Sequence, residues 1–178
     1  DQPYFAGFRS LASNGLYKPV LNVFRMFSQM SGRRLAAESD HAVSLAAILR
    51  DGVRGQPDVS ALASLDKNTL CVIAWHYHDD DIPGPDAEVE LRLNGLPLAS
   101  GEAKLRHFRI DEDHSNAFAA WKRMGSPQPP TPEQYAQLEQ AGQLTALGAA
   151  EILRVADAKA RLWFKLPRQA VSLVRISW

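Results

Sequence analysis

Residues 126–130 read Ser-Pro-Gln-Pro-Pro and restrict the backbone strongly. They cannot be helical, because each proline lacks a backbone donor and pushes the residue before it towards extended geometry. A helix is nevertheless predicted directly after them. Thr131 is a good N-cap, Pro132 suits the first helical position, and Gln134 completes a capping box.

A second helix is predicted before the prolines. Residues 111–113 are Asp-Glu-Asp and precede the N-cap candidates Ser115 and Asn116, so three carboxylates lie near the positive end of the helix dipole. The apolar positions of this helix are Phe118, Trp121 and Met124, and Gly125 ends it. The sequence thus predicts two short helices between Asn116 and Gly142, with strand-rich segments before and after them.

These flanking segments predict an antiparallel β-sandwich of about seven strands. Alternating or continuous apolar residues occupy 59–65, 69–78, 89–93, 103–110, 151–155, 161–166 and 170–178. The strand at 69–78 is apolar on both faces until His76 and His78, which predicts a central position in its sheet. Asp66-Lys67-Asn68 and Asn94-Gly95 predict hairpin turns. The predicted fold class is therefore mainly β.

A detached strand-helix piece is predicted to precede the sandwich. Lys18-Pro19 opens a helix that Gly32 ends, and Arg33-Arg34 adds positive charge near its negative end. The helix carries a wide apolar stripe of Val20, Val23, Phe24, Phe27 and Met30. This stripe must dock on the chain's own strands or on other apolar surface, because such a helix is marginal in isolation. Residues 33–57 predict a linker, within which 42–49 forms a strand or one or two helical turns.

The composition is globular, with 46% hydrophobic and 22% charged residues. Twenty basic residues balance twenty acidic ones, so the charge indicates neither a nucleic-acid partner nor an anionic membrane surface. No apolar run approaches the roughly 20 residues of a membrane span, and no signal segment opens the chain. Cys71 lies inside an apolar run and is predicted to be core.

Three groups of residues invite a functional interpretation, and each has a structural alternative. His76, His78 and residues 79–81 could share a metal ion, but a solvated strand end followed by an acidic loop explains the same residues. Asp111, Glu112, Asp113 and His114 could act as acid and base, although adjacent positions are poorly placed to clamp opposite faces of a sugar. The tryptophans could stack on sugars, but their places in strands and on a helix favour packing: Trp75, Trp121, Trp163 and Trp178.

Three stretches are more distinctive: IDEDHSNAFAAWKRMGSPQPPTPEQ at 110–134, GFRSLASNGLYKPVLNVFRMFSQMSG at 7–32 and VIAWHYHDDD at 72–81. The first resembles a segment near the C-terminus of bacterial β-xylosidases of glycoside hydrolase family 39, where H-S-N opens a helix and W-x-x-M-G-S-P precedes a T-P-E-Q helix. The second resembles the last β/α unit of that family's (β/α)8 barrel, and the third resembles a strand of its accessory sandwich. The resemblance covers nearly the whole chain but only the C-terminal part of the family's architecture.

The resemblance implies a last barrel β/α unit at 1–34, a linker at 35–58, and an accessory sandwich at 59–178 with a helical insert at 116–142. It also implies a parent enzyme that releases xylose from the non-reducing ends of xylo-oligosaccharides with retention, without cofactor or metal. The family's catalytic glutamates lie on upstream barrel strands. Because no position here matches their motifs, we expect no catalytic residue in this chain.

Tyr4 and Phe5 resemble the loop after the last barrel strand, where ligands of such barrels bind, and are therefore candidates for the rim of the sugar site. The sequence departs from the family there, with Phe5-Ala6-Gly7 where H-G-G is frequent. The expected partners are the remainder of the barrel and, in the parent enzyme, a xylo-oligosaccharide.

The chain starts at Asp1 without Met, which we interpret as a trimmed N-terminus of a soluble bacterial protein of the cytoplasm or periplasm. Self-association is another way to cover the apolar stripe. An alternative function is a stand-alone carbohydrate-binding or protein-interaction module, which would need a row of exposed aromatic rings on one sandwich face.

Overall fold

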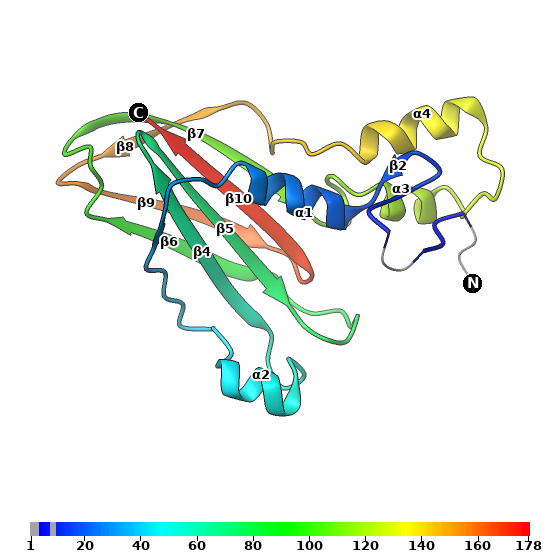
Figure 1. Ribbon diagram of the computed structural model, residues 1–178, viewed down its shortest axis with the longest axis horizontal. Helices are drawn as coiled ribbons and strands as arrows, with labels where there is room; N and C mark the ends of the chain where they lie inside the picture. The colour runs from blue at the N-terminus through cyan, green and yellow to red at the C-terminus, as the bar shows by residue number, and fades with distance from the viewer. Residues whose placement is uncertain (1–3, 8–9) are drawn as a thin grey trace.

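The structure, a computed structural model, describes residues 4–7 and 10–178, and its strands form an antiparallel β-sandwich (Figure 1). The larger sheet has the order β3-β4-β5-β10-β7-β8. Its strands are β3 (Arg33–Leu35), β4 (Asp58–Asp66), β5 (Thr69–Tyr77), β10 (Ala170–Ser177), β7 (Gly101–Ile110) and β8 (Glu151–Val155). The smaller sheet pairs β6 (Ala87–Asn94) with β9 (Lys159–Leu166). From β4 to β10 there are seven strands, and every pairing is antiparallel, so the predicted fold class is confirmed.

Alternating residues of the two sheets face each other and form the main core. On the larger sheet, Leu70, Val72, Val174 and Ile176 point inward, and Leu93 and Ala160 meet them from the smaller sheet. The strand β5 lies between β4 and β10, which confirms its predicted central position. The predicted hairpin before it is also confirmed, since Asp66 and Thr69 are paired across a two-residue turn.

The predicted hairpin at Asn94-Gly95 is wrong. The backbone of Gly95 does take the left-handed conformation of a tight turn, with φ +69°. However, β6 pairs with β9 and β7 pairs with β8 and β10, so the turn carries the chain from one sheet to the other. Leu96 directly after it is buried between the sheets, and its N–H donates to Ala158 O at 2.9 Å. Burial of Leu96 and long-range pairing thus override the local hairpin signal.

The helix α1 (Pro19–Ser28) follows a short hairpin of β1 (Ala12–Ser13) and β2 (Leu16–Tyr17). The helix begins with proline as predicted, but it ends before Gln29 rather than at Gly32. Gly32, with φ +76°, instead allows the chain to pass close to the end of β4. A Cβ at this position would lie 2.2 Å from Leu65 O. Arg33 and Arg34 accordingly belong to β3.

The prediction of a detached strand-helix piece is also wrong, because α1 packs on the outer face of the larger sheet (Figure 1). Met26 of α1 is fully buried there, in a cluster with Cys71, Ile73, Phe108, Ile110 and Leu173. The apolar stripe is divided: Val23, Met26 and Met30 meet the sheet, while Val20, Phe24 and Phe27 are 43%, 57% and 44% exposed. One side of the helix is therefore core and the other is open.

A single amide joins α1 to the insert. Asn22 is fully buried, and its Nδ2 donates to Ser115 O and to Gly142 O, both at 2.9 Å. These two carbonyls flank the insert formed by α3 (Ala117–Arg123) and α4 (Pro132–Ala141). The helix and both ends of the insert are thus held at one point, which we call the Asn22 clamp.

Both predicted insert helices are confirmed, together with their caps. Asn116 Oδ1 accepts from Ala119 N–H at 3.0 Å, and Gly125 with φ +83° ends α3 in a Schellman arrangement. The side chains of Thr131 and Gln134 form the reciprocal capping box of α4.

The region predicted as a linker contains β3 and the helix α2 (Leu45–Asp51), which decides between strand and helix for 42–49. Ser44 caps α2, while Leu45 and Leu49 are exposed. The domain boundaries at 34/35 and 58/59 remain predictions. None of the described helices is long and apolar enough to cross a membrane.

Candidate functional site

The N-terminal segment lies against the insert in an aromatic cluster of Tyr4, Phe5, Phe118 and Trp121. The ring of Phe5 is 5.3 Å from the ring of Trp121 and 5.6 Å from that of Phe118, measured between centroids. Tyr4 stacks on Trp121 at 6.4 Å. The indole Nε1 of Trp121 donates to Pro127 O at 2.8 Å, so the proline-rich turn fixes the centre of the cluster.

The backbone of residues 4–7 is held from the other side by the β1–β2 hairpin and the start of α1. Asn14 Nδ2 donates to Tyr4 O at 2.7 Å, Ser13 Oγ to Ala6 O at 2.8 Å, and Lys18 Nζ to Gly7 O at 2.6 Å. The segment that carries the predicted rim residues is therefore fixed by both backbone and side-chain contacts.

The two rim candidates differ in their surroundings. Phe5 is only 5% exposed and fills the centre of the aromatic cluster, so its ring reaches no open surface. Tyr4 is half-buried. Burial, and then the nearby Tyr135, raise the pKa of Tyr4, so the phenol stays neutral and can both donate and accept a hydrogen bond. Of the pair, Tyr4 is thus the residue that keeps part of its surface exposed.

The carboxylate of Asp111 organises the loop before α3. It accepts from Asp113 N–H at 2.9 Å, from His114 N–H at 2.8 Å and from His114 Nδ1 at 2.8 Å, and the Arg109 guanidinium lies 3.5 Å away. Burial acts to raise the pKa of Asp111, but the hydrogen bonds from His114 and Asp113 lower it below its ordinary value. A general acid for glycoside hydrolysis needs a raised pKa, so Asp111 is suited to a structural role.

The other acidic residues near the insert are exposed. Asp113 lies 3.5 Å from Arg123, whose guanidinium also donates to Glu112 O. The pKa of Glu133 in the first turn of α4 is lowered by backbone and Thr131 hydrogen bonds. These contacts stabilise the ends of α3 and α4.

The histidines of β5 and the loop after it are buried, which corrects the interpretation of a solvated strand end. Both are 3% exposed. His76 Nδ1 lies 2.9 Å from Leu166 O, which ties β5 to the end of β9. His78 Nδ1 accepts from Asp80 N–H at 3.0 Å, and Nε2 lies 3.1 Å from Arg54 O. Among residues 4–7 and 10–178, no three His, Cys, Asp or Glu side chains converge to hold a metal ion.

Three of the four tryptophans pack within the chain, but Trp163 does not lie in its core. Trp121 is buried, Trp178 packs on the inter-sheet core, and Trp75 Nε1 donates to Asp58 Oδ2 at 2.6 Å. Trp163 is 63% exposed on the outer face of β9, opposite Glu90. Strand alternation places its neighbours Leu162 and Phe164 inward, so Trp163 must point outward.

A group of hydrogen-bonded polar side chains, His107, Arg109 and Ser172, lies between the sheets. His107 Nε2 is 2.9 Å from Ser172 Oγ, and Arg109 Nε donates to the same hydroxyl at 2.7 Å. Arg109 also donates to Lys165 O at 2.9 Å. Burial, followed by the charge of Arg109, lowers the pKa of His107 to about 4. The imidazole is therefore neutral at pH 7, and it shares a hydrogen bond with the Ser172 hydroxyl.

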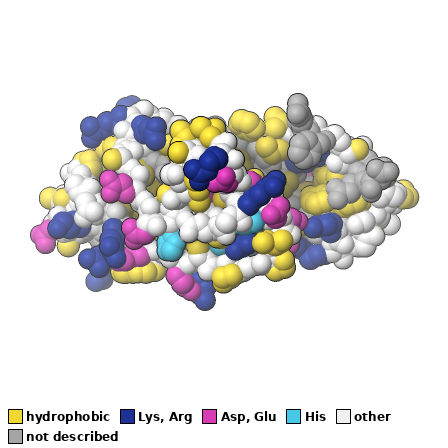
Figure 2. All heavy atoms as spheres, turned by 90° about the horizontal axis from the view of Figure 1, so that it is seen from below, with side chains coloured by type: hydrophobic (Ala, Val, Ile, Leu, Met, Phe, Trp, Pro, Cys, Tyr) yellow, Lys and Arg dark blue, Asp and Glu magenta, His cyan; other side chains and the backbone are white. Residues whose placement is uncertain are grey.

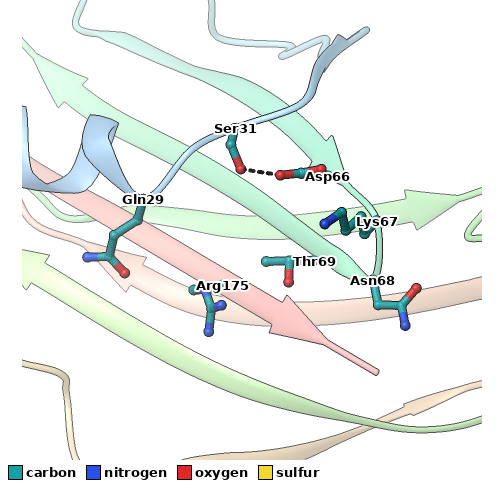
Figure 3. Close-up of a pocket in the computed structure, with 7 residues that line it drawn as sticks. All are labelled: Gln29, Ser31, Asp66, Lys67, Asn68, Thr69 and Arg175. Carbon is teal, nitrogen blue, oxygen red and sulfur yellow. Dashed lines mark hydrogen bonds between the residues drawn. The ribbon is translucent and has the colours of Figure 1, made fainter.

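A recess of about 380 Å³ opens on the outer face of the larger sheet, beside the end of α1 (Figure 3). We call it the polar recess, because every residue that lines it is polar: Gln29, Ser31, Asp66, Lys67, Asn68, Thr69 and Arg175. Ser31 Oγ donates to Asp66 Oδ2 at 2.7 Å on one wall. No sequence pattern indicates this recess, since its residues come from three separate segments with no shared motif.

The charge distribution elsewhere is mixed. Figure 2 shows Lys, Arg, Asp and Glu side chains interspersed with hydrophobic ones over the face seen from below. Ion pairs on the outer face of the smaller sheet follow the same pattern, with Arg161 and Glu90 at 3.4 Å and Lys165 and Glu88 at 3.3 Å.

The sequence of this chain is similar to known proteins. The sequence profile of glycosyl hydrolases family 39 matches residues 1–149. The mouse protein "Alpha-L-iduronidase" is 30% identical over 171 residues, which are 90% of this chain and 25% of the mouse protein.

Solved structures share the fold. The family 39 enzyme of Xanthomonas axonopodis pv. citri superimposes with a TM-score of 0.71 at 18% identity, over 92% of this chain and 31% of that one. A monomeric beta-xylosidase from Caulobacter crescentus CB15 gives a TM-score of 0.67 at 20% identity, over 92% and 31% of the two chains. The chain therefore spans between a quarter and a third of the length of these relatives.

Proposed function

Because the chain belongs to glycosyl hydrolase family 39, we propose that it is the C-terminal portion of a glycosidase. In this proposal, residues 1–34 are the last β/α unit of a (β/α)8 barrel, 35–58 the linker, and 59–178 the accessory sandwich. The proposal is supported by the short span of the chain relative to its relatives, whose remaining length would supply the other barrel units. The catalytic groups would then lie outside this chain.

The divided stripe of α1 is the structural observation that carries this proposal. Val23, Met26 and Met30 pack on the sandwich, while Val20, Phe24 and Phe27 face solvent. Leaving such side chains in water costs several kcal/mol, at about 25 cal/mol per Å² of apolar surface. We propose that the remainder of the barrel covers the open side, which makes α1 the joint between barrel and sandwich. Self-association of the chain would be the other way to cover it.

The proposed reaction of the whole protein is release of xylose from the non-reducing ends of xylo-oligosaccharides with retention of configuration. Such a reaction needs two carboxyl groups and water, and no cofactor. The fold shared with the Caulobacter beta-xylosidase supports it. An iduronidase-like activity is the second candidate, favoured by the 30% identity to the mouse protein. Parallel assays of the whole protein with a chromogenic β-xyloside and a chromogenic α-L-iduronide separate the two.

Within this proposal, the present chain supports the site rather than performing the chemistry. Tyr4 would contribute to the rim of the sugar site, from a segment fixed by the insert. We expect Tyr4→Ala to raise KM in the whole protein with a smaller change in kcat, because a rim contact binds ground state and transition state alike. An unchanged KM would remove Tyr4 from the rim.

The competing proposal of a stand-alone carbohydrate-binding module has less support. Such a module would need a row of exposed aromatic rings on one face. Among the described residues of the sandwich strands, the exposed aromatic residues are Trp163 and Tyr77, and they lie on different sheets. Titration of residues 1–178 with xylo-oligosaccharides tests it, and saturable binding would favour the module. We expect no turnover of a chromogenic xyloside by these residues. Turnover would instead assign catalysis to carboxylates such as Asp111 or Glu133.

A further inference from the structure

We propose that the polar recess binds the carboxylate of a sugar acid. The recess lies on the outer face of the larger sheet, where α1 ends and the β4–β5 turn begins (Figure 3). None of its lining residues belongs to the aromatic cluster. This inference does not depend on the proposed glycosidase activity.

The first step of the argument is an unusual pair of like charges. Arg175 of β10 and Arg106 of β7 are directly opposite each other in the sheet register. Like charges directly opposite each other destabilise a sheet, and an anion bound between them would relieve this repulsion. Among residues 4–7 and 10–178, none of the ion pairs includes Arg106, Arg175 or the nearby Lys104 and Lys67. The chain as a whole has zero net charge, so these unpaired cations form a positive patch that the overall charge does not explain.

The second step is the contribution of neighbouring groups. The carbonyl groups at the end of α1 lie beside Gln29 and favour a positive charge there. Arg106 lies outside the lining, next to Arg175 on the neighbouring strand. Arg106 lies over the Phe108 ring, 5.4 Å from its centroid. Asp66 is the one carboxylate in the lining, and it accepts a hydrogen bond from Ser31 on the far wall. The cationic side of the recess is thus open to an external anion.

The third step is the match between these groups and a ligand. A guanidinium binds a carboxylate with two parallel hydrogen bonds, and Arg175 presents one beside the Thr69 hydroxyl (Figure 3). Gln29, Ser31 and Asp66 offer amide, hydroxyl and carboxylate groups that suit the hydroxyls of a sugar ring. The volume of about 380 Å³ accommodates one sugar unit. The absence of apolar side chains from this lining disfavours a hydrophobic ligand.

Calorimetric titration of the whole protein with D-glucuronate, D-glucose and acetate tests the proposal. We expect saturable binding of glucuronate, no measurable binding of glucose, and binding of acetate at least tenfold weaker than that of glucuronate. Equal affinity for glucose would overturn the role of the carboxylate, and equal affinity for acetate would overturn the role of the sugar ring.

Variants connect the binding to the recess. Arg175→Gln should weaken glucuronate binding about tenfold or more, because a charge-assisted hydrogen bond is lost. The matched control Arg161→Gln removes the same charge from the other sheet and should leave the affinity unchanged. If Arg175→Gln fails to fold, as seen by circular dichroism, Arg106→Gln gives the same test with an expected loss of several-fold. Glucuronate binding that survives both folded variants would place its site elsewhere and refute the proposal.

Discussion

Replacing Asn22 by leucine tests the clamp between α1 and the insert. The leucine side chain has the same number and branching of heavy atoms as asparagine, although it is bulkier, and it cannot donate hydrogen bonds. Ser115 O and Gly142 O would each lose a donor at 2.9 Å while staying buried. A buried carbonyl left without a partner costs about 1–3 kcal/mol, so two of them cost about 2–6 kcal/mol. Part of this cost is offset because leucine has no amide to desolvate. We therefore expect the free energy of unfolding to fall by about 3 kcal/mol.

Thermal unfolding followed by circular dichroism measures this loss. For a chain of this size, about 3 kcal/mol corresponds to a fall in Tm of about 6–12 °C. Hydrogen exchange should accelerate first in α1 and in the insert, because both lose their common attachment. The control is Gln137→Leu on the exposed face of α4, which should change stability by less than about 0.5 kcal/mol. An Asn22→Leu protein with the wild-type Tm would show that the clamp contributes no stability.

Three further perturbations have defined outcomes. The pKa of His107 is about 4 in the folded state, so only the unfolded chain takes up a proton as the pH falls from about 6.5 to about 4, and stability should fall by up to about 3 kcal/mol over that window. Urea unfolding at several pH values should show this slope, and His107→Gln should flatten it. Gly32→Ala should destabilise by at least about 2 kcal/mol through strain and a clash with Leu65 O, whereas Gly95→Ala, with open space around it, should cost about 1 kcal/mol. The thiol of Cys71 is buried and its pKa is raised, so it should react with maleimide only on unfolding, and rapid labelling of the native protein would contradict its core position.

The features that could be predicted from the sequence are those determined by neighbouring residues. The capping box of Thr131 and Gln134 and the glycine end of α3 depend on contacts within a few residues, and both are present. The central place of β5 could also be predicted, because a strand apolar on both faces has to be covered on both.

The features that could not be predicted depend on long-range pairing. Asn94-Gly95 has the residues of a hairpin turn, but β6 pairs with residues 159–166, about 70 positions away. The same pairing determines that Trp163 faces solvent. The polar recess depends on Gln29, Thr69 and Arg175 meeting at one place, and no local pattern in the sequence indicates that encounter.

The pairing of β5 with β10 has a consequence for synthesis of the chain. β10 lies between β5 and β7 in the sheet, yet it follows both of them in the chain and is therefore synthesised after them. At about 5–20 residues per second, the 93 positions from Tyr77 to Ala170 take about 5–20 s. During this time β5 presents an unpaired edge, and β7 presents another once it has been made. Open edges of apolar strands are templates for aggregation. A nascent chain stalled before residue 170 should therefore require a chaperone, and synthesis of the eight residues of β10 should end that requirement.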